Sequence, residues 1–383
     1  MSERTPRVSA DVLDAVLGAL TRRGATTRGD LIRATGLSRP SVSGAVADLL
    51  ETGVVEEVLD PPSGRGRPTA RIVFNRRRPI AWGIEIGRGG IAVAGVDATG
   101  SVVASAAAPR SPAEDAVRTA LALGDRLVAE NGIELDHVAR VAVGTPGPLA
   151  ESPDGDDEAR HDRRLVADRV RERFGCAVEV GNNVQYRAVA EARAREDIDD
   201  LAYLRIDEGI GGALVRDGSP FGGAFGGAGE FGHISIDPRG PRCRCGGRGC
   251  LELTASAPAL LAAAGCRDLA DLAARAESGE DDAVSTIARA AEATGHALAG
   301  VLSVADPGLV VVGGSVASLP GFLARTESTL RDCAPSWATR RLRITAAVTD
   351  RLLGATGAAH AALAAIDTPA TDAGQHSDRK DTP

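Results

Sequence analysis

The sequence predicts an α/β protein in which an N-terminal helix-turn-helix domain with a wing precedes two α/β lobes. Three observations lead to this fold class. Apolar residues recur at helical spacing near the N-terminus, strand-like and helix-like segments alternate after residue 79, and three cysteines gather with one histidine between residues 233 and 250. With 383 residues and 43% hydrophobic content, the chain is long enough for two or three separate cores.

Charge is divided unevenly along the chain, which carries a net charge of −8. Residues 1–78 hold 13 arginines against 9 acidic residues, a net +4, which leaves −12 on the remainder. A basic front on an acidic body indicates that only the N-terminal part meets a polyanion. Lys380 is the only lysine, which excludes chemistry that needs a buried amine.

The sequence contains neither a run of about 18 apolar residues nor the apolar segment of a signal peptide. We therefore expect a cytoplasmic protein with no membrane partner. Six cysteines, three of them clustered and three scattered, do not form the pattern of a disulfide framework.

The first 78 residues contain the elements of a winged helix-turn-helix. An apolar stripe predicts a helix over 9–23, Thr27 begins a second helix with a capping box, and Ser38 caps a third helix. Segments 54–59 and 71–74 are the expected strands of the wing.

Small hydroxyl and arginine side chains at the start of the third helix suit phosphates and base edges in a major groove. Arginines on the loop Pro61–Pro68 suit a minor groove, the alternative being a solvated linker loop. The expected DNA-binding residues are Thr27, Arg28, Ser38, Arg39, Ser41, Ser43, Arg65 and Arg67.

Behind this domain the pattern predicts two lobes. Strands are expected at 80–86, 91–96, 138–143, 177–180, 202–206, 212–216 and 309–312, and helices at 112–130, 184–195, 257–264, 282–303 and 355–366. The expected domains are residues 1–78 for DNA binding, 79–180 for a small lobe completed by 351–366, 181–350 for a large lobe, and 367–383 as a disordered tail.

Three cysteines and one histidine within 18 residues supply the four soft ligands of a closed tetrahedral zinc site. Two acidic residues bracket them, so zinc would fix two carboxylates and an imidazole in a geometry suited to the hydroxyls of a small polyol. The alternative is a structural knuckle with no ligand nearby. The expected zinc ligands are His233, Cys243, Cys245 and Cys250, and the bracketing acids are Glu230 and Glu252.

These motifs resemble the ROK family of sugar kinases and related repressors. The resemblance lies in the zinc signature over 229–252 and in flanking landmarks at 143–148, 311–314 and 354–359, and it covers about residues 10 to 366. The segments 27–36, 37–43 and 64–68 are similar to the winged helix-turn-helix that the family's regulators carry in front.

The resemblance implies an actin-like, ribonuclease-H-like two-lobed sugar-kinase fold. It also implies zinc ligation by the four residues above. The sugar-binding residues that it implies are Asn182, Asn183, Glu230, His233 and Glu252.

Three departures from the family's kinases affect phosphoryl transfer. The first phosphate turn, normally Asp-x-Gly-Gly-Thr-Lys, reads Glu85 to Gly90 without the Thr and Lys. The second turn begins with Asp207 and Glu208, whose charges would repel a polyphosphate. Asn183 replaces the general base, a loss that costs about 10²–10⁴ in rate. We therefore expect a body that binds a sugar without phosphorylating it, and a chain that is not an enzyme.

The sequence thus predicts a transcriptional regulator, most simply a repressor, of carbohydrate metabolism genes. The expected partners are a double-stranded DNA operator, a sugar or sugar derivative, and further copies in a homodimer or dimer of dimers. Two alternatives stay open. One is an ATP-dependent ROK sugar kinase with a DNA-binding head, and the other is a constitutive DNA-binding protein whose body only dimerises.

Overall fold

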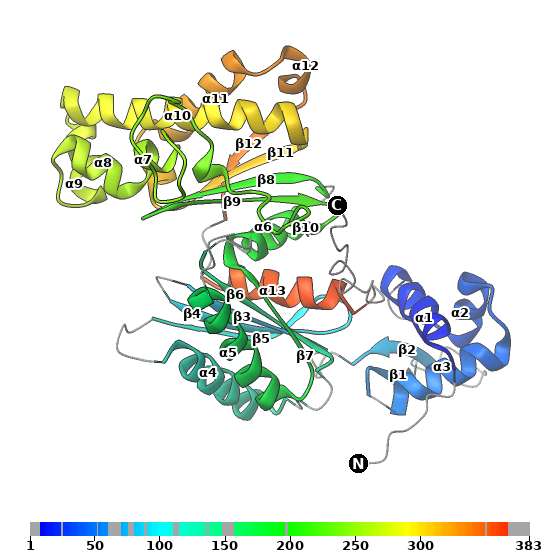
Figure 1. Cartoon of the computed structure of the whole chain (residues 1–383). Helices are drawn as coiled ribbons and strands as arrows, with labels where there is room; N and C mark the ends of the chain where they lie inside the picture. Colours follow the sequence, from blue (N-terminus) through cyan, green and yellow to red (C-terminus); the bar gives the residue numbers. More distant parts are fainter. Residues whose placement is uncertain are drawn as a thin grey trace, which may run out of the picture.

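The structure is a computed structural model that describes residues 8–23, 26–51, 53–59, 70–75, 80–87, 90–109, 115–133, 135, 138–147, 157–195, 198–348 and 351–366. The expected wing loop with Arg65 and Arg67, and the expected tail 367–383, lie outside the described residues. Figure 1 shows the N-terminal domain beside two sheets that lie one above the other with helices between them.

The N-terminal domain, called the head below, packs three helices against a two-stranded sheet. Fully buried Leu20, Leu31, Val46 and Ile72 lie in its core. Because these side chains come from all three helices and one strand, one core joins them, which confirms the expected winged helix-turn-helix. Its elements are α1 (Ala10–Arg23), α2 (Arg28–Thr35), α3 (Arg39–Glu51) and the antiparallel strands β1 (Val55–Leu59) and β2 (Ala70–Phe74).

The first large sheet has the strand order β5-β4-β3-β6-β7. Its first three strands form an antiparallel meander, and β6 and β7 continue it in parallel from β3. Helices α4 (Ala116–Asn131) and α5 (Asp157–Phe174) cover one face. The strands are β3 (Ala81–Ile86), β4 (Ile91–Val96), β5 (Val102–Ala108), β6 (Arg140–Thr145) and β7 (Ala177–Asn182).

The second large sheet has the order β10-β9-β8-β11-β12 and carries the largest hydrophobic core on its outer face. Its strands are β8 (Leu201–Ile206), β9 (Ile210–Arg216), β10 (Ser219–Phe221), β11 (Leu309–Gly313) and β12 (Arg343–Ala346). The helices of this lobe are α7 (Glu252–Ala255), α8 (Ala257–Ala264), α9 (Leu269–Glu277), α10 (Asp281–Ala305), α11 (Phe322–Cys333) and α12 (Ser336–Thr339).

Two helices, α6 (Asn183–Arg193) and α13 (Leu353–Ala364), lie side by side between the two sheets (Figure 1). Their backbones approach so closely that a Cβ on Gly357 would lie 1.7 Å from the Tyr186 carbonyl oxygen. A Cβ on Gly83 would lie 2.0 Å from the carbonyl oxygen of Ala355, so α13 is equally tight against β3. Only glycine permits these contacts, which fix α13 against both α6 and the first sheet.

The mixed α/β fold with two lobes is the one expected, but several elements were missed. Strands β5, β10 and β12 are half-exposed or short, and α5 is rich in charge, so their apolar periodicity is weak. Strand β7 runs to Asn182, and the expected domain boundaries stay predictions. Among the described helices, none is both long and apolar enough to cross a membrane.

Candidate functional site

The start of α3 presents hydroxyl and guanidinium groups on the surface of the head. The Ser41 N–H donates to Ser38 Oγ at 3.3 Å, and the two hydroxyl oxygens lie 2.8 Å apart. Ser38, Arg39 and Ser43 are exposed and Ser41 is half-buried. The expected cap at Ser38 is therefore present, while contact of these side chains with DNA stays a prediction.

The start of α2 is held by two interactions. Thr27 and Asp30 form the expected capping box, and the Thr27 hydroxyl lowers the pKa of the Asp30 carboxyl to about 2. Arg28 forms an ion pair with Glu57 on β1. This pair ties the start of α2 to the strand that leads into the wing, so Arg28 has a protein partner when the head is free of DNA.

His233, Cys243, Cys245 and Cys250, the metal cluster below, come together as the sequence predicts. Their ligand atoms all lie within 4.8 Å of one another. Gly249 makes this possible because its φ of +58° is left-handed and a Cβ there would lie 1.8 Å from the Asp237 carbonyl oxygen.

The spacing of the metal cluster fits one tetrahedral ion. The Sγ atoms of Cys245 and Cys250 lie 3.6 Å apart, and Cys243 Sγ lies 3.7 Å from His233 Nδ1. Thiolates at 2.3 Å from a tetrahedral ion would stand about 3.8 Å from each other. The four residues could therefore hold a metal ion, with His233 Nε2 left to face another group.

Glu230 and Glu252 lie beside the metal cluster, and together with Asn183, the first residue of α6, they are called the polar cluster below. Glu230 lies close enough to His233 and Glu252 for their charges to act on its pKa. Glu252 accepts a hydrogen bond from the Ile210 N–H at 2.9 Å. A Cβ on Gly211 would touch Val184, the residue after Asn183, at 2.8 Å. The start of β9 therefore contacts both Glu252 and the start of α6.

The members of the polar cluster differ in their bonding. In the described part of the chain the side chains of Asn183 and Glu230 make no hydrogen bond. Burial raises the pKa of the Glu230 carboxyl, and Glu252 adds to the effect while His233 and Arg244 oppose it. Glu252 also binds Arg244 at 3.1 Å. Asn183 and Glu230 thus have donors and acceptors left for a ligand.

Asn182 differs from its neighbour because both ends of its side-chain amide are used. Its Oδ1 accepts the Val184 N–H at 2.7 Å and its Nδ2 donates to the Gly147 carbonyl at 2.9 Å. The side chain therefore caps α6 and fixes the turn after β6. A sugar contact by Asn182 stays a prediction.

The first expected phosphate turn contains a buried ion pair that the sequence did not reveal. Glu85 is 3% exposed. Its two carboxylate oxygens accept hydrogen bonds from Nε and Nη2 of Arg187, at 2.7 and 2.9 Å. A Cβ on Gly354 would lie 2.2 Å from the Glu85 carboxyl carbon, so α13 closes over the pair. Residues 88–89 of this turn lie outside the described residues.

The second expected phosphate turn also has a neutralised carboxylate. The Asp207 carboxylate accepts a hydrogen bond from Arg205 Nε at 2.5 Å. It accepts two more from the N–H and the hydroxyl of Ser315, at 2.7 and 2.8 Å. Burial alone would raise the pKa of Asp207, but Arg205 and Ser315 outweigh it and the pKa is lowered. Glu85, Arg187, Arg205 and Asp207, the ion-pair cluster below, hold two positive and two negative charges. The repulsion expected from Asp207 is therefore offset, whereas Glu208 is exposed.

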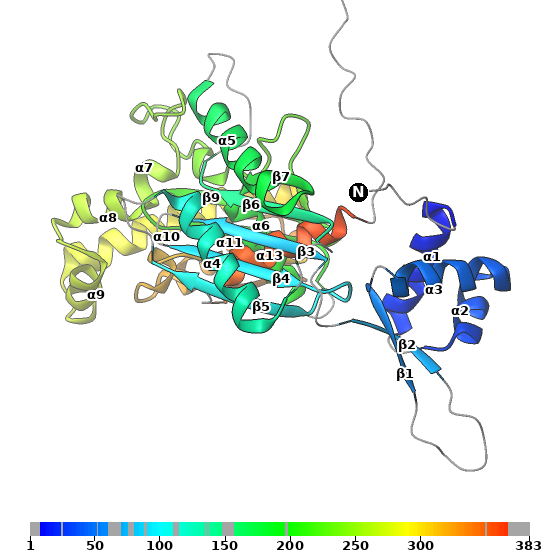
Figure 2. The same cartoon turned by 90° about the horizontal axis from the view of Figure 1, so that it is seen from below.

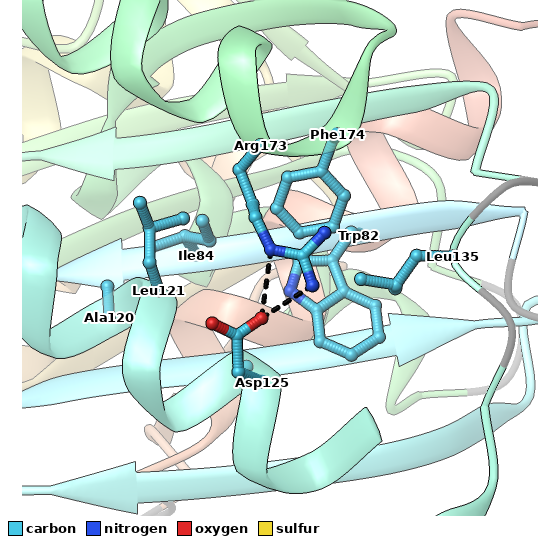
Figure 3. Close-up of a pocket in the computed structure, with 9 residues that line it drawn as sticks. Trp82, Ile84, Ala120, Leu121, Asp125, Leu135, Arg173 and Phe174 are labelled. Carbon is cyan, nitrogen blue, oxygen red and sulfur yellow. Dashed lines mark hydrogen bonds and ion pairs between the residues drawn. The ribbon is translucent and has the colours of Figure 1, made fainter. Parts of the chain in front are cut away.

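A narrow crevice lies elsewhere, between the first sheet and helices α4 and α5 (Figure 3). Trp82 and Phe174 fill it with ring centroids 5.9 Å apart, and Arg173 binds Asp125 across its rim. It contains no residue of the metal or polar cluster and is core packing rather than a ligand site.

The chain belongs to the ROK family, whose model matches residues 81–365, and a MarR family model matches residues 15–66. An N-acetylmannosamine kinase of Citrobacter koseri is 38% identical over 152 residues, 38% of this chain and 52% of that protein. The chain thus spans about half the length of the curated relatives it matches.

Two solved structures extend the comparison. A ROK family transcriptional regulator, a homologue of the E. coli MLC protein, aligns with a TM-score of 0.73 at 21% identity over 93% of this chain and 96% of its own. A ROK hexokinase of Thermus thermophilus aligns with a TM-score of 0.65 at 27% identity over 75% of this chain and 99% of its own.

These comparisons contradict the expectation that the chain is not an enzyme. Its curated relatives are named kinases, and ROK kinases are among its structural neighbours. The physical argument behind the expectation was incomplete, because it counted the carboxylates at the two turns without their arginine partners. Arg187 and Arg205 stand in no motif, so spacing alone gave no signal for them.

Proposed function

We propose that this chain is a DNA-binding transcriptional regulator, a repressor of carbohydrate metabolism genes, whose ROK body binds a sugar or a sugar derivative. One observation carries the proposal. The hexokinase aligns over 99% of its own length with only 75% of this chain, whereas the regulator aligns with 93% of it. The head is thus an addition to a kinase-like body, and the proposed function must explain why this chain and the regulator have it while the hexokinase does not.

A role of the head in DNA binding is supported by its surface chemistry. Hydroxyl groups and the Arg39 guanidinium stand exposed at the start of α3, on a domain with a net +4 over residues 1–78. In helix-turn-helix proteins the first residues of the second motif helix contact base edges. Two heads in a homodimer would read a site with two-fold symmetry.

A role of the body in sugar binding is supported by the unpaired groups of the polar cluster. The Asn183 amide can both donate to and accept from a hydroxyl, and the Glu230 carboxylate accepts. Zinc in the metal cluster would stabilise the loop that supports Glu230 and Glu252, since one nitrogen and three sulfurs form a set that zinc prefers. Bound there, zinc would supply structure, since His233, Cys243, Cys245 and Cys250 would fill its four positions.

The DNA function is tested by selection of duplexes from a random pool by the full chain. We expect an enriched sequence with two-fold symmetry, bound more weakly at higher salt because phosphate contacts release counterions. An Arg39→Ala variant should bind it about 5- to 150-fold more weakly, which corresponds to about 1–3 kcal/mol. Failure to enrich any sequence would refute the DNA function.

A second candidate is an ATP-dependent ROK sugar kinase with a DNA-binding head, favoured by the 38% identity to an N-acetylmannosamine kinase. It predicts ADP formation from ATP when N-acetylmannosamine or glucose is supplied. The matched variant is Asn183→Asp, which restores the carboxylate that would accept the proton of the attacking hydroxyl. Turnover that rises in this variant supports transfer at this site, and turnover absent from both proteins refutes the second candidate.

A further inference from the structure

The turn between β4 and β5, Asp97–Ser101, is unusually well fixed for a surface turn. Asp97 is fully buried, and its Oδ1 accepts the N–H groups of Thr99 and Ser101 at 2.8 and 3.0 Å and the Thr99 hydroxyl at 2.5 Å. Gly100 closes the turn at a φ of +80°. These hydrogen bonds converge on one carboxylate oxygen and stabilise the turn in this conformation.

One side of this turn contacts the head. Ala98 is half-buried and packs, as Val54 does, against the head's hydrophobic core, which includes Phe74. Figures 1 and 2 both show the head beside the first sheet, on the far side from α8 and α9. The turn is therefore a point at which the body touches the domain proposed to bind DNA.

The other side of the turn contacts α13 and α6. His360 on α13 is 8% exposed and donates from Nε2 to the Gly100 carbonyl at 2.8 Å. Its Nδ1 is buried without a partner among the described residues. A Cβ on Gly100 would lie 3.5 Å from Arg193 Nη1, so the last residue of α6 also lies against the turn.

Helix α6 begins at the polar cluster and ends against the Asp97–Ser101 turn. Asn183 of the polar cluster is its first residue and Arg193 its last, which puts them about 15 Å apart along the helix axis. The close glycine contact at Gly357 couples α13 to the same helix. A shift of α6 that a ligand at Asn183 causes therefore reaches the turn through Arg193 directly and through His360 on α13.

We propose that the Asp97–Ser101 turn, held by His360 and Arg193, couples the polar cluster to the head. This proposal rests on the proposed regulatory function and adds its physical route. An apolar contact at Ala98 and a single hydrogen bond at Gly100 can be made or broken between two arrangements. Coupling between sites typically changes affinity 5- to 150-fold, and it acts in both directions. DNA on the head must then alter the packing at the far end of α6.

The experiment measures amide hydrogen exchange of the full chain with and without the DNA duplex selected above, and so needs no identified sugar. We expect DNA to change exchange about 5-fold or more in residues 97–101, 190–195 and 357–363 of the wild-type protein. The Ala98→Glu variant should bind the duplex and lose these changes. Ala107→Glu, at an exposed alanine on β5, is the matched control and should keep them.

A second variant, His360→Ala, removes the hydrogen bond without altering the head, and carries the test if Ala98→Glu folds or binds DNA poorly. It should lose the change in 357–363 while the head is still protected by DNA. The proposal is overturned if DNA binds but leaves the three segments unchanged, or if both variants respond as the wild type does. A chain that selects no DNA refutes the regulatory function instead, so the two failures are distinct.

Discussion

The polar cluster and the ion-pair cluster adjoin the same turn between β8 and β9, yet they differ in how many of their side-chain groups are already hydrogen bonded. Asn183 and Glu230 make no side-chain hydrogen bond within the described residues. Glu85 and Asp207 accept hydrogen bonds on every carboxylate oxygen, from Arg187, Arg205 and Ser315. A ligand gains new bonds at the first cluster, whereas at the second it must first displace existing ones.

This difference separates what the two candidate functions require. Sugar binding at Asn183 and Glu230 uses groups that make no hydrogen bond within the described residues, so no existing bond has to be displaced. Phosphoryl transfer requires a polyphosphate near the ion-pair cluster, where Glu85 is clamped by Arg187 and covered by Gly354. A phosphate can exchange for a carboxylate on an arginine, since both accept its paired N–H groups. Nucleotide binding would then release Glu85 from Arg187.

The metal cluster lies between Glu230 and Glu252 in the sequence, and loss of the ion that it could hold should have the largest effect. Cys250→Ser removes a buried candidate ligand two residues before Glu252. We expect the variant to bind no metal and its free energy of unfolding to fall by several kcal/mol, because structural zinc binds small domains with about 10–16 kcal/mol. Metal content and thermal unfolding measure this. Cys266→Ser, half-buried and outside the metal cluster, is the control and should retain the metal. A Cys250→Ser protein with full metal content would contradict the assignment.

The ion-pair cluster gives the next largest effect. Arg187→Leu leaves Glu85 buried without a partner, which should lower the free energy of unfolding by about 3–5 kcal/mol. Glu85→Leu combined with Arg187→Leu should recover much of this loss, because no charge is then buried. Chemical denaturation of the three proteins measures both.

An exposed pair supplies the control for that comparison. Arg325 and Glu292 have side chains 56% and 41% exposed, and Arg325→Leu should cost about 0–1 kcal/mol. Equal losses from Arg187→Leu and Arg325→Leu would show that burial does not distinguish the two pairs in solution.

Much of the fold and of the metal cluster could be predicted because the responsible residues are close in sequence. The cap at Thr27, the stripe of the first helix and the cysteines within 18 residues are local patterns. A Cys-x-Cys spacing fixes the chemistry of a site before its geometry is known. The same holds for the glycines of that loop, since tight turns require them.

The ion-pair cluster could not be predicted as a whole because, although Arg205 and Asp207 are two residues apart, its other contacts join distant parts of the chain. Glu85 and Arg187 are 102 residues apart, and Asp207 and Ser315 are 108 apart. No periodicity records such a pairing, and the turns were therefore interpreted from their own charges alone. Asn182 and Asn183 could be placed together but not distinguished, because only the structure shows that the amide of Asn182 is already used.

The open character of the polar cluster is tested by Glu230→Gln. If the carboxylate binds a sugar hydroxyl, its loss should weaken sugar binding by about 10- to 150-fold, as for a hydrogen bond to a charged group worth about 1.5–3 kcal/mol. Calorimetry with N-acetylmannosamine and glucose measures it. Glu208→Gln removes an exposed carboxylate from the adjoining turn and should leave the affinity unchanged. Equal weakening in both variants would point to overall charge instead of a contact at Glu230.

The smallest effect concerns pH and again distinguishes the two clusters. Because the folded-state pKa of Asp207 is lowered, its ionised form stabilises the protein above the ordinary pKa of an aspartate. That stability is lost as the pH falls through the lower folded value. The free-energy difference between the wild type and Asp207→Asn should therefore be constant near neutrality and shrink below about pH 4.

The pKa of Glu230 is raised, so the ionised form of this carboxyl destabilises the folded protein, the reverse of the effect at Asp207. Its ionised form is disfavoured by burial, and Glu230→Gln should stabilise the protein near neutrality, with a gain that fades as the pH falls through the raised pKa. Unfolding curves from neutral pH to pH 3 measure both trends, with exposed Asp217→Asn as the control. If the Asp207 carboxylate is paired and the Glu230 carboxylate is not, the free-energy difference between wild type and variant should change with pH in opposite directions for the two residues. Parallel slopes would mean that the two clusters do not differ in solution.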